Sequence, residues 1–392
     1  MKVFIKWLSA CATRKAELEQ YRSFLVKNGH EIVGKPQDSE VILLWTCGFR
    51  RDHKDNSLVE VKRYQNEYNA KLIVAGCLPD IVPQELAEGF SGYVINWRDD
   101  KKKMEEYFGR GVVNFDNVCS VFIQENVCED VDKFRKENPN KDVTFHDQFI
   151  KILVSEGCNY KCTYCSEKLA FPPYRSFPEN EIVEACRRMV EKTGCYEIIL
   201  ISDSLGDYGC DIGTNLPSLM HNLLEINPKL KIALNNFNPE GFVLFYEEIS
   251  NFLAKGDIRH LNLPIQSASD RILKLMNRPY SRSDLDKIFG LLNEICYVEF
   301  DTHIIIGFPG ETKDDINETV EFILKHKPKY VLASCYMETH GMESYNLSNK
   351  VTELTMRERL QAAKSRITAA GIICNTDDSG LSIDRFRRLN IA

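Results

Sequence analysis

The stretch VSEGCNYKCTYCSE, residues 154–167, decides the fold class of this chain. It continues the apolar run FIKILVS, residues 149–155, which has the composition of a buried β-strand. Folds built from parallel strands and helices place their ligand sites in the loops that follow the carboxyl ends of the strands. Cys158, Cys162 and Cys165 therefore stand where such a site is expected.

The spacing of these three cysteines, C-x-x-x-C-x-x-C, indicates an iron-sulfur cluster. A structural zinc site needs a fourth protein ligand, and no second Cys-x-x-Cys pair is spaced to supply one. Three thiolates suit a 4Fe-4S cluster with one iron left open, which can chelate the amino and carboxylate groups of a ligand. The alternative is three buried cysteines that act as small apolar residues.

Downstream of this loop, short apolar runs alternate with helical patterns. The runs FIKILVS, EIILIS, LKIAL, IRHLNL, VEFDTHIII and YVLAS read as six parallel strands, with helices at 179–192, 215–226, 242–254, 270–276, 283–294 and 313–326. Six such units predict a partial (β/α)6 barrel over residues 149–350. Residues 351–392 are expected to add a helix at 355–370 and a tail.

Residues 1–108 show a second alternation of the same kind. The runs VFIKWL, VILLW and LIVA flank helical patterns at 13–28 and 52–68, which predicts a parallel sheet with helices on its faces, of the flavodoxin-like type. The charged stretch 109–148 lacks a core pattern and is expected to be a linker. The fold class is therefore α/β, with two domains.

A second set of cysteines follows the predicted strands of the N-terminal domain: Cys11, Cys47 and Cys77. Parallel neighbours place their carboxyl ends side by side, so three thiols from three strands should meet at one edge of the sheet. That arrangement predicts a second three-cysteine cluster site. Three buried structural cysteines remain the alternative.

Composition limits the setting of the chain. The 392 residues contain no apolar run approaching the ~18 residues of a membrane span, and no signal peptide pattern opens the chain. A cytoplasmic location is expected, where 14 cysteines stay reduced. The net charge of −7 does not favour a nucleic-acid surface, and the compact basic tail consists of Arg385, Arg387 and Arg388.

Several long motifs resemble the radical S-adenosylmethionine (radical SAM) methylthiotransferase family over about residues 1–345. They are TC at 46–47, AGCLP at 75–79, CNYKCTYC at 158–165, LISDSLGDYGCDIGTNLP at 200–217, LPIQSASDRILKLMNRPYSRSDL at 263–285 and DTHIIIGFPGETKDD at 301–315. The DYGCDIGTNLP stretch is most similar to the branch that modifies threonylcarbamoyladenosine in tRNA. The family as a whole acts on tRNA or on a ribosomal protein.

The resemblance implies two [4Fe-4S] clusters and S-adenosylmethionine as cofactors. The cluster on Cys158, Cys162 and Cys165 would cleave S-adenosylmethionine to a radical that abstracts hydrogen. The cluster on Cys11, Cys47 and Cys77 would deliver sulfur, and a second S-adenosylmethionine would supply the methyl group. Flavodoxin or ferredoxin is the expected electron donor.

The resemblance also indicates contacts to S-adenosylmethionine. In this superfamily the loop matching GFPGE lines the adenine. Ser202 and Asp203 are candidates for the methionine end, with a helix-capping turn as the alternative. The expected cofactor-binding residues are Tyr164, Ser202, Asp203, Gln266, Ser267, Gly307, Phe308, Pro309, Gly310 and Glu311.

The substrate-facing parts depart from the family pattern. The family's C-terminal TRAM-type β-barrel domain needs at least ~40 residues, whereas 22 residues follow residue 370. The sequence therefore predicts that the TRAM-type domain is absent. Its absence and the acidic net charge favour a peptide or protein substrate, and tRNA is the alternative target. Two further alternatives are thiolation without methylation and a non-catalytic iron-sulfur electron carrier. A carrier needs no pocket for S-adenosylmethionine, so the GFPGE loop argues against it.

Overall fold

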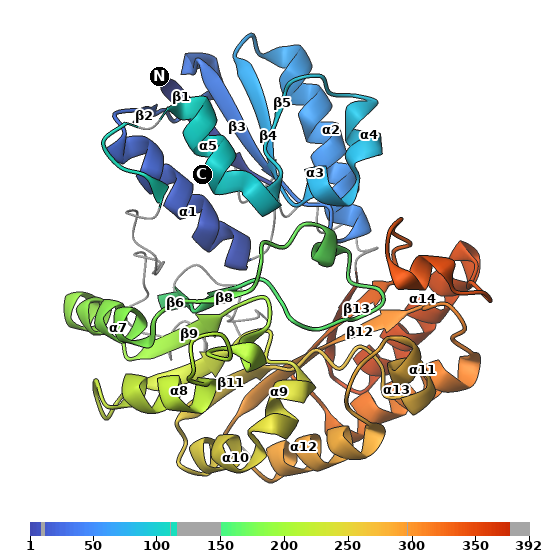
Figure 1. The fold of residues 1–392 in the computed structure, drawn as a ribbon. Helices are drawn as coiled ribbons and strands as arrows, with labels where there is room; N and C mark the ends of the chain where they lie inside the picture. Colours follow the sequence, from blue (N-terminus) through green and yellow to red (C-terminus); the bar gives the residue numbers. More distant parts are fainter. Residues whose placement is uncertain (9–11, 110, 116–149, 296, 377–392) are drawn as a thin grey trace. The chain divides into compact units, whose positions relative to one another are not determined.

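A computed structural model describes residues 1–8, 12–109, 111–115, 150–295 and 297–376. The described residues form two compact units (Figure 1). The N-terminal unit comprises residues up to Phe115 together with Ser166–Tyr174, and the barrel unit comprises the described residues of 150–165 and 175–376. Most of the predicted linker 109–148 lies outside the described residues.

The N-terminal unit contains a parallel sheet with helices on its faces, as the sequence predicted. The sheet has five strands, and its two short outer strands were not predicted. Its strands follow the order β2-β1-β3-β4-β5. Their bounds are β1 Lys2–Trp7, β2 Glu31–Ile32, β3 Val41–Thr46, β4 Lys71–Gly76 and β5 Tyr93–Val94. The three strands that precede the predicted second cysteine set, β1, β3 and β4, are therefore direct neighbours.

Alternate residues of β3 enter two separate hydrophobic cores because successive side chains of a strand point to opposite faces. Val41, Leu43 and Trp45 pack beneath α1 (Ala12–Lys27) and α5 (Asp100–Phe108). Ile42 and Leu44 pack against α2 (Arg51–Glu67), α3 (Leu78–Ile81) and α4 (Pro83–Ala87). Helices therefore cover both faces of this sheet.

The barrel unit contains a seven-stranded parallel sheet in the order β14-β13-β12-β11-β10-β9-β6. Its strands are β6 Ile150–Leu153, β9 Glu197–Ile201, β10 Lys231–Leu234, β11 Ile258–Asn262, β12 Glu299–Ile306, β13 Tyr330–Cys335 and β14 Ile373–Thr376. The first six strands of this sheet in chain order, β6 to β13, coincide with the six predicted strands. Strands of the sheet that follow one another in the chain are neighbours in it. This confirms the predicted α/β class with a partial barrel.

Helices follow the strands of this sheet and lie along one side of it (Figure 1). They are α7 Glu179–Thr193, α8 Leu216–Leu224, α9 Pro239–Leu244, α10 Tyr246–Ala254, α11 Asp270–Leu275, α12 Arg282–Glu294, α13 Lys313–His326 and α14 Glu353–Ala369. Capping boxes begin α12 at Ser281 and α13 at Thr312, and each satisfies two free N–H groups of its helix. No helix among the described residues is long and apolar enough to cross a membrane.

Other features also differ from the sequence-based expectations. The predicted helix 242–254 is two helices, because Phe245 leaves the helical conformation (φ −114°, ψ 34°) between α9 and α10. The expected tail contains β14, which pairs with β13 and buries Cys374. A short antiparallel pair, β7 (Ser155–Glu156) and β8 (Arg175–Ser176), was also not predicted.

Candidate functional site

The loop that carries Cys158, Cys162 and Cys165 begins where β6 ends. Gly157 has a φ of 79°, a left-handed conformation that glycine adopts without steric cost. Its N–H donates to Asp203 Oδ2 at 3.0 Å, which ties the loop to the carboxyl end of β9. The β7–β8 pair joins residues 155–156 to residues 175–176 and so closes the base of the segment between them.

The far end of the loop is anchored to the end of α11. The Thr163 N–H donates to the Met276 carbonyl at 3.1 Å, and the Thr163 hydroxyl donates to the Leu275 carbonyl at 2.8 Å. Asn277 Nδ2 donates to the Lys161 carbonyl at 2.8 Å. The backbone around Cys162 is therefore fixed by the protein itself.

The structure describes the surroundings of Cys162 and Cys158. Cys162 is buried, and its Sγ accepts a hydrogen bond from Arg278 Nη1 at 2.9 Å. Burial raises the pKa of Cys158 to about 12. No three Cys, His, Asp or Glu side chains of the described residues converge as ligands of one metal ion. The binding of a 4Fe-4S cluster by these three cysteines, each to a different iron, stays a prediction.

The predicted adenine loop, Gly307–Glu311, is shaped by its own side chains. A Cβ at Gly307 (φ 82°) would lie 2.1 Å from Met356 Cγ, so only glycine fits. Phe308 is fully buried in a cluster with Met276 and Tyr336, and Tyr164 packs edge-on against it at 6.3 Å between ring centroids. The ring of Phe308 therefore packs in the hydrophobic core beneath the loop.

Glu311 closes the same loop. Its Oε1 accepts hydrogen bonds from the Gly307 N–H at 3.0 Å and from Arg359 Nη1 at 2.8 Å. Burial raises the pKa of Glu311 to about 7, against the opposing effect of these two donors. Pro309 is buried and Gly310 has a φ of 84°. These contacts hold the backbone of the loop in one conformation.

The remaining predicted contact residues bond to neighbouring parts of the fold. Ser202 Oγ lies 2.6 Å from Ser155 Oγ, and Ser267 Oγ lies 3.3 Å from Thr319 Oγ1; Ser202 and Ser267 are both buried. Gln266 has a φ of 61° and its backbone bridges to Ile304. These contacts of Ser202, Gln266 and Ser267 hold the strand ends in place, a structural role like that of the capping turn named above as the alternative. Direct ligand contact by these residues stays a prediction.

In the N-terminal unit, the structure brings Cys47 and Cys77 together. Both side chains are buried at the carboxyl ends of β3 and β4, and the Gly48 N–H donates to Cys77 Sγ at 3.3 Å. The hydrogen bond between the two thiols, together with burial, raises the pKa of Cys77 well above its ordinary value. Cys11 lies outside the described residues. Two thiols of the predicted set thus meet at one edge of the sheet.

Gly76, at the end of β4, lies so close to the backbone of Thr46 in β3 that its substitution should be severe. It has a φ of 93°, and a Cβ there would lie 2.2 Å from the Thr46 carbonyl oxygen. Gly76→Ala is expected to lower the free energy of unfolding by about 3 kcal/mol, because backbone strain and steric overlap add. Urea denaturation of the purified protein measures this loss.

Gly29→Ala is the matched control, since Gly29 also has a positive φ of 78° but nothing lies within 4 Å of its Cβ position. That variant should lose only about 1 kcal/mol from backbone strain. Equal losses in the two variants would contradict the close contact between β3 and β4 at Thr46.

Two residues of the site were missed by sequence reasoning. Arg278 donates both to Cys162 Sγ and to Glu240 Oε2, the latter at 2.8 Å, and the side chains of Arg278 and Glu240 are 6% and 4% exposed. The ion pair joins residues 38 positions apart, so no local spacing could reveal it. Arg278 nevertheless stands within the motif LPIQSASDRILKLMNRPYSRSDL, residues 263–285, which resembles the family.

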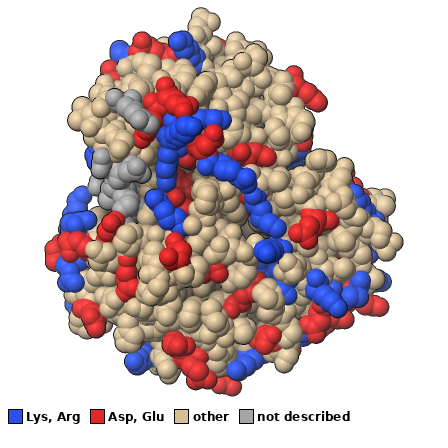
Figure 2. Space-filling view, viewed as in Figure 1, with Lys and Arg blue, Asp and Glu red and all other residues tan. Residues whose placement is uncertain are grey.

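Charged residues on the surface of α5 are mixed in sign. Over this helix, Figure 2 shows Lys and Arg side chains beside Asp and Glu side chains. Lys102 Nζ lies 3.8 Å from Glu106 and Lys103 Nζ lies 3.6 Å from Asp99. The Lys101–Lys103 run is therefore a solvated helix face with its own counter-charges.

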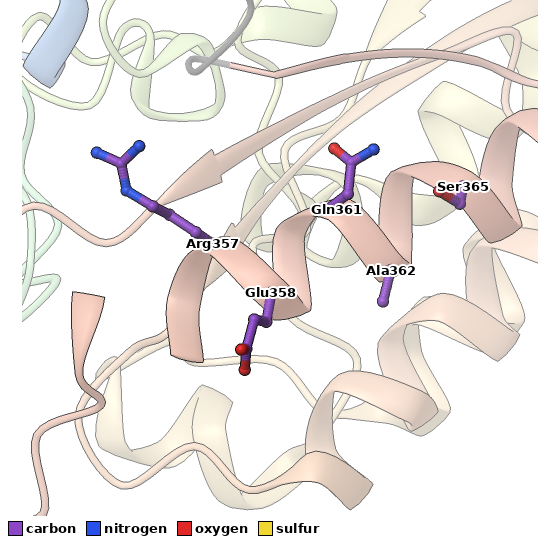
Figure 3. Close-up of a pocket in the computed structure, with 5 residues that line it drawn as sticks. All are labelled: Arg357, Glu358, Gln361, Ala362 and Ser365. Atoms are coloured by element: carbon purple, nitrogen blue, oxygen red, sulfur yellow. The ribbon is translucent and has the colours of Figure 1, made fainter. Parts of the chain in front are cut away.

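A surface hollow lies along one face of α14, lined by Arg357, Glu358, Gln361, Ala362 and Ser365 (Figure 3). These residues recur at helical spacing, so a single helix supplies the whole lining. The lining includes no cysteine and none of the residues predicted to bind a cofactor. The hollow therefore adds nothing to the candidate site.

Comparisons with known protein families agree with the two-unit organisation. Residues 152–323 match the radical SAM superfamily, and residues 2–95 match the uncharacterized protein family UPF0004. Each match covers most of one predicted α/β domain.

Named relatives of two kinds are similar to this chain. A probable threonylcarbamoyladenosine tRNA methylthiotransferase from Pyrococcus horikoshii is 29% identical over 344 residues, covering 87% of this chain and 78% of that one. The ribosomal protein uS12 methylthiotransferase RimO from Thermotoga sp. (strain RQ2) is 28% identical over 402 residues, covering 98% and 86%. The threonylcarbamoyladenosine tRNA methylthiotransferase of Homo sapiens is 30% identical over 340 residues, covering 83% and 55%.

Solved structures share the fold at low sequence identity. TsrM from Kitasatospora setae, a radical S-adenosylmethionine methyltransferase with cobalamin and a [4Fe-4S] cluster bound, superposes with a TM-score of 0.61 at 13% identity, covering 88% of this chain and 76% of that one. OxsB, a cobalamin-dependent S-adenosylmethionine radical enzyme, gives a TM-score of 0.54 at 12% identity, covering 94% and 56%. The family matches and the named relatives confirm the resemblance seen in the sequence: the chain belongs to the radical SAM methylthiotransferase family, enzymes that use S-adenosylmethionine and [4Fe-4S] clusters.

Proposed function

We propose that this enzyme inserts a methylthio group into an unactivated C–H bond of a peptide or protein side chain. The observation that carries the sulfur chemistry is the meeting of Cys47 and Cys77 at the carboxyl edge of the N-terminal sheet, in a chain that also has the barrel loop of Cys158, Cys162 and Cys165. An enzyme that only cleaved S-adenosylmethionine would need the barrel loop alone.

Each cysteine set would hold one [4Fe-4S] cluster, with Cys11 completing the N-terminal set. When bound, the clusters and S-adenosylmethionine supply the radical and the sulfur chemistry. The residues of the chain orient these groups. Asp203 fixes the start of the barrel loop through the Gly157 N–H, and the bonds from Gly307 and Arg359 to Glu311 fix the loop predicted to face the adenine.

Charge supports a peptide or protein substrate. An RNA-binding surface neutralises phosphates with Lys and Arg side chains. This chain carries a net charge of −7, and the basic run on α5 is paired with Glu106 and Asp99 (Figure 2). The basic residues at 385–388 lie outside the described residues. A peptide would be recognised through its side chains, without a need for such a surface.

tRNA is the second candidate substrate. It is favoured by the similarity of this chain to the relatives from Pyrococcus horikoshii and Homo sapiens. By their names, these relatives act on threonylcarbamoyladenosine in tRNA. The RimO relative, by its name, acts on a ribosomal protein and has similar identity to this chain. Similarity to named relatives therefore does not choose between a protein and a tRNA substrate, and an experiment is needed to do so.

The substrate class is tested by comparing cells that contain the unmutated enzyme with cells that contain Cys162→Ala. Tryptic peptides and nucleosides from digested tRNA are analysed by mass spectrometry from the same cultures. We expect a peptide whose methylthio mass increment is lost in the Cys162→Ala cells, and identical nucleosides in both. A methylthio-adenosine that disappears with Cys162→Ala would contradict the peptide assignment and establish tRNA as the substrate.

A further inference from the structure

Arg278 is a buried cation in direct contact with a predicted cluster ligand. Its Nη1 lies 2.9 Å from Cys162 Sγ, and its Nη2 lies 2.8 Å from Glu240 Oε2. One guanidinium thus bridges a thiol and a carboxylate that are both buried. A guanidinium keeps its charge at any physiological pH, so the thiol always faces a cation.

The surrounding structure fixes the guanidinium in place. The Arg278 N–H donates to the Leu273 carbonyl at 2.9 Å, which holds the residue against the end of α11. Arg278 Nε lies 3.3 Å from the Tyr280 hydroxyl, which donates to the Ile265 carbonyl at 2.7 Å. The same end of α11 also anchors the loop through the Met276 carbonyl and Thr163. The guanidinium and the Cys162 backbone are therefore held by one element.

Stability alone does not account for this ion pair. Replacing a buried pair with apolar residues of similar size is often neutral or stabilising, because both charges lose their hydration. A functional effect follows from the sulfur contact. The reduction potential of an iron-sulfur cluster depends on hydrogen bonds to its sulfurs and on nearby charge, and a cation favours the reduced, more negative form.

We propose that Arg278 is a positioning residue that orients Cys162 and raises the reduction potential of the cluster bound there, while Glu240 limits that rise. The inference goes beyond the proposed function and depends on it for the assignment of Cys162 as a cluster ligand. Arg278 and Glu240 therefore act in opposite directions: loss of the cation lowers the potential, and loss of the carboxylate leaves the cation uncompensated and raises it.

The test is an anaerobic redox titration of the reconstituted full-length chain, followed by electron paramagnetic resonance. A Cys47→Ala, Cys77→Ala background removes the N-terminal thiols, so the barrel cluster is observed by itself. We expect Arg278→Met to make reduction about tenfold less favourable, a shift of about 59 mV to more negative potential for one electron. Glu240→Gln should shift the potential in the positive direction, and Arg278→Lys should stay closer to the unmutated protein than Arg278→Met.

Arg366→Met is the matched control. Arg366 pairs with Glu321 and Asn317 on the barrel unit, so its removal deletes a cation of the same kind from a site whose partners include no thiol. This variant should keep the potential of the unmutated protein. An equal shift in Arg366→Met and Arg278→Met would mean that overall charge, rather than the sulfur contact, sets the effect, and would overturn the inference.

The iron content of each variant shows whether a missing redox signal comes from loss of the cluster or from a wrong inference. If Arg278→Met does not retain iron, that loss supports orientation of Cys162, and the opposite-sign shift is then tested with Glu240→Gln alone. Unchanged potentials in Arg278→Met and Glu240→Gln, or shifts of both in one direction, overturn the inference. If the background protein binds no cluster that depends on Cys162, the proposed function itself is wrong.

Discussion

Anaerobic reconstitution of the unmutated chain is expected to give about eight iron atoms per chain, four from each 4Fe-4S cluster. Each cysteine set supplies three thiolates and leaves one iron open. The triple variant Cys158→Ala, Cys162→Ala, Cys165→Ala should therefore retain about four iron atoms, held by Cys11, Cys47 and Cys77. Colorimetric iron analysis of the desalted protein measures both values.

Cysteines outside the two sets provide the control for this count. Cys186 on α7 and Cys374 on β14 are buried in the barrel unit and belong to neither set. A Cys186→Ala, Cys374→Ala variant should keep the full iron content, since the lost thiols bind none. If the unmutated chain binds only about four iron atoms, the N-terminal cluster does not exist as predicted.

Cleavage of S-adenosylmethionine should depend on the barrel cysteines alone. With a strong reductant, the unmutated enzyme is expected to form 5′-deoxyadenosine, and Cys162→Ala should reduce this to background because its cluster loses a ligand. Cys47→Ala, Cys77→Ala should form 5′-deoxyadenosine at a rate close to the unmutated enzyme. Liquid chromatography of quenched reactions gives the three rates.

The same variants separate cleavage from sulfur insertion. In a Cys47→Ala, Cys77→Ala protein that still forms 5′-deoxyadenosine, the methylthio product should be absent, because the proposed sulfur carrier is lost. Native amounts of that product would contradict the role of the N-terminal cysteines. Loss of 5′-deoxyadenosine in this variant would instead show that cleavage requires both sets.

The sequence predicted the parts of the fold that follow from local periodicity. Six barrel strands and three N-terminal strands are visible as apolar runs, and parallel topology is enough to bring Cys47 and Cys77 to one sheet edge. The GFPGE loop is recognisable from its resemblance to the family motif, and the positive φ of Gly307 and Gly310 explains why glycine occupies both positions. These features depend on residues close together in the chain.

The features that were missed depend on pairing between distant or very short segments. The strand β14 has four residues and is defined by its partner β13, so its own sequence carries little signal. The β7–β8 pair joins two-residue segments across the cluster loop. The ion pair of Arg278 and Glu240 needs the end of α11 and the start of α9 to lie together, which periodicity cannot predict.

Two of the predicted contact residues have partners within the fold. Ser202 and Ser267 stand at strand ends, and their hydroxyl groups lie against Ser155 and Thr319. A strand-end serine has the same sequence pattern whether it binds a ligand or supports the fold. The distinction needs side-chain positions, which the sequence does not contain.

The central claim is that this enzyme transfers both sulfur and a methyl group to its substrate. The most direct measurement is the mass of the modified product after reaction with S-adenosylmethionine carrying a deuterated methyl group. The expected product gains one sulfur and one deuterated methyl group and is absent with Cys47→Ala, Cys77→Ala. A product that gains sulfur without the labelled methyl group would establish thiolation alone, and a methylated product without sulfur would contradict the account.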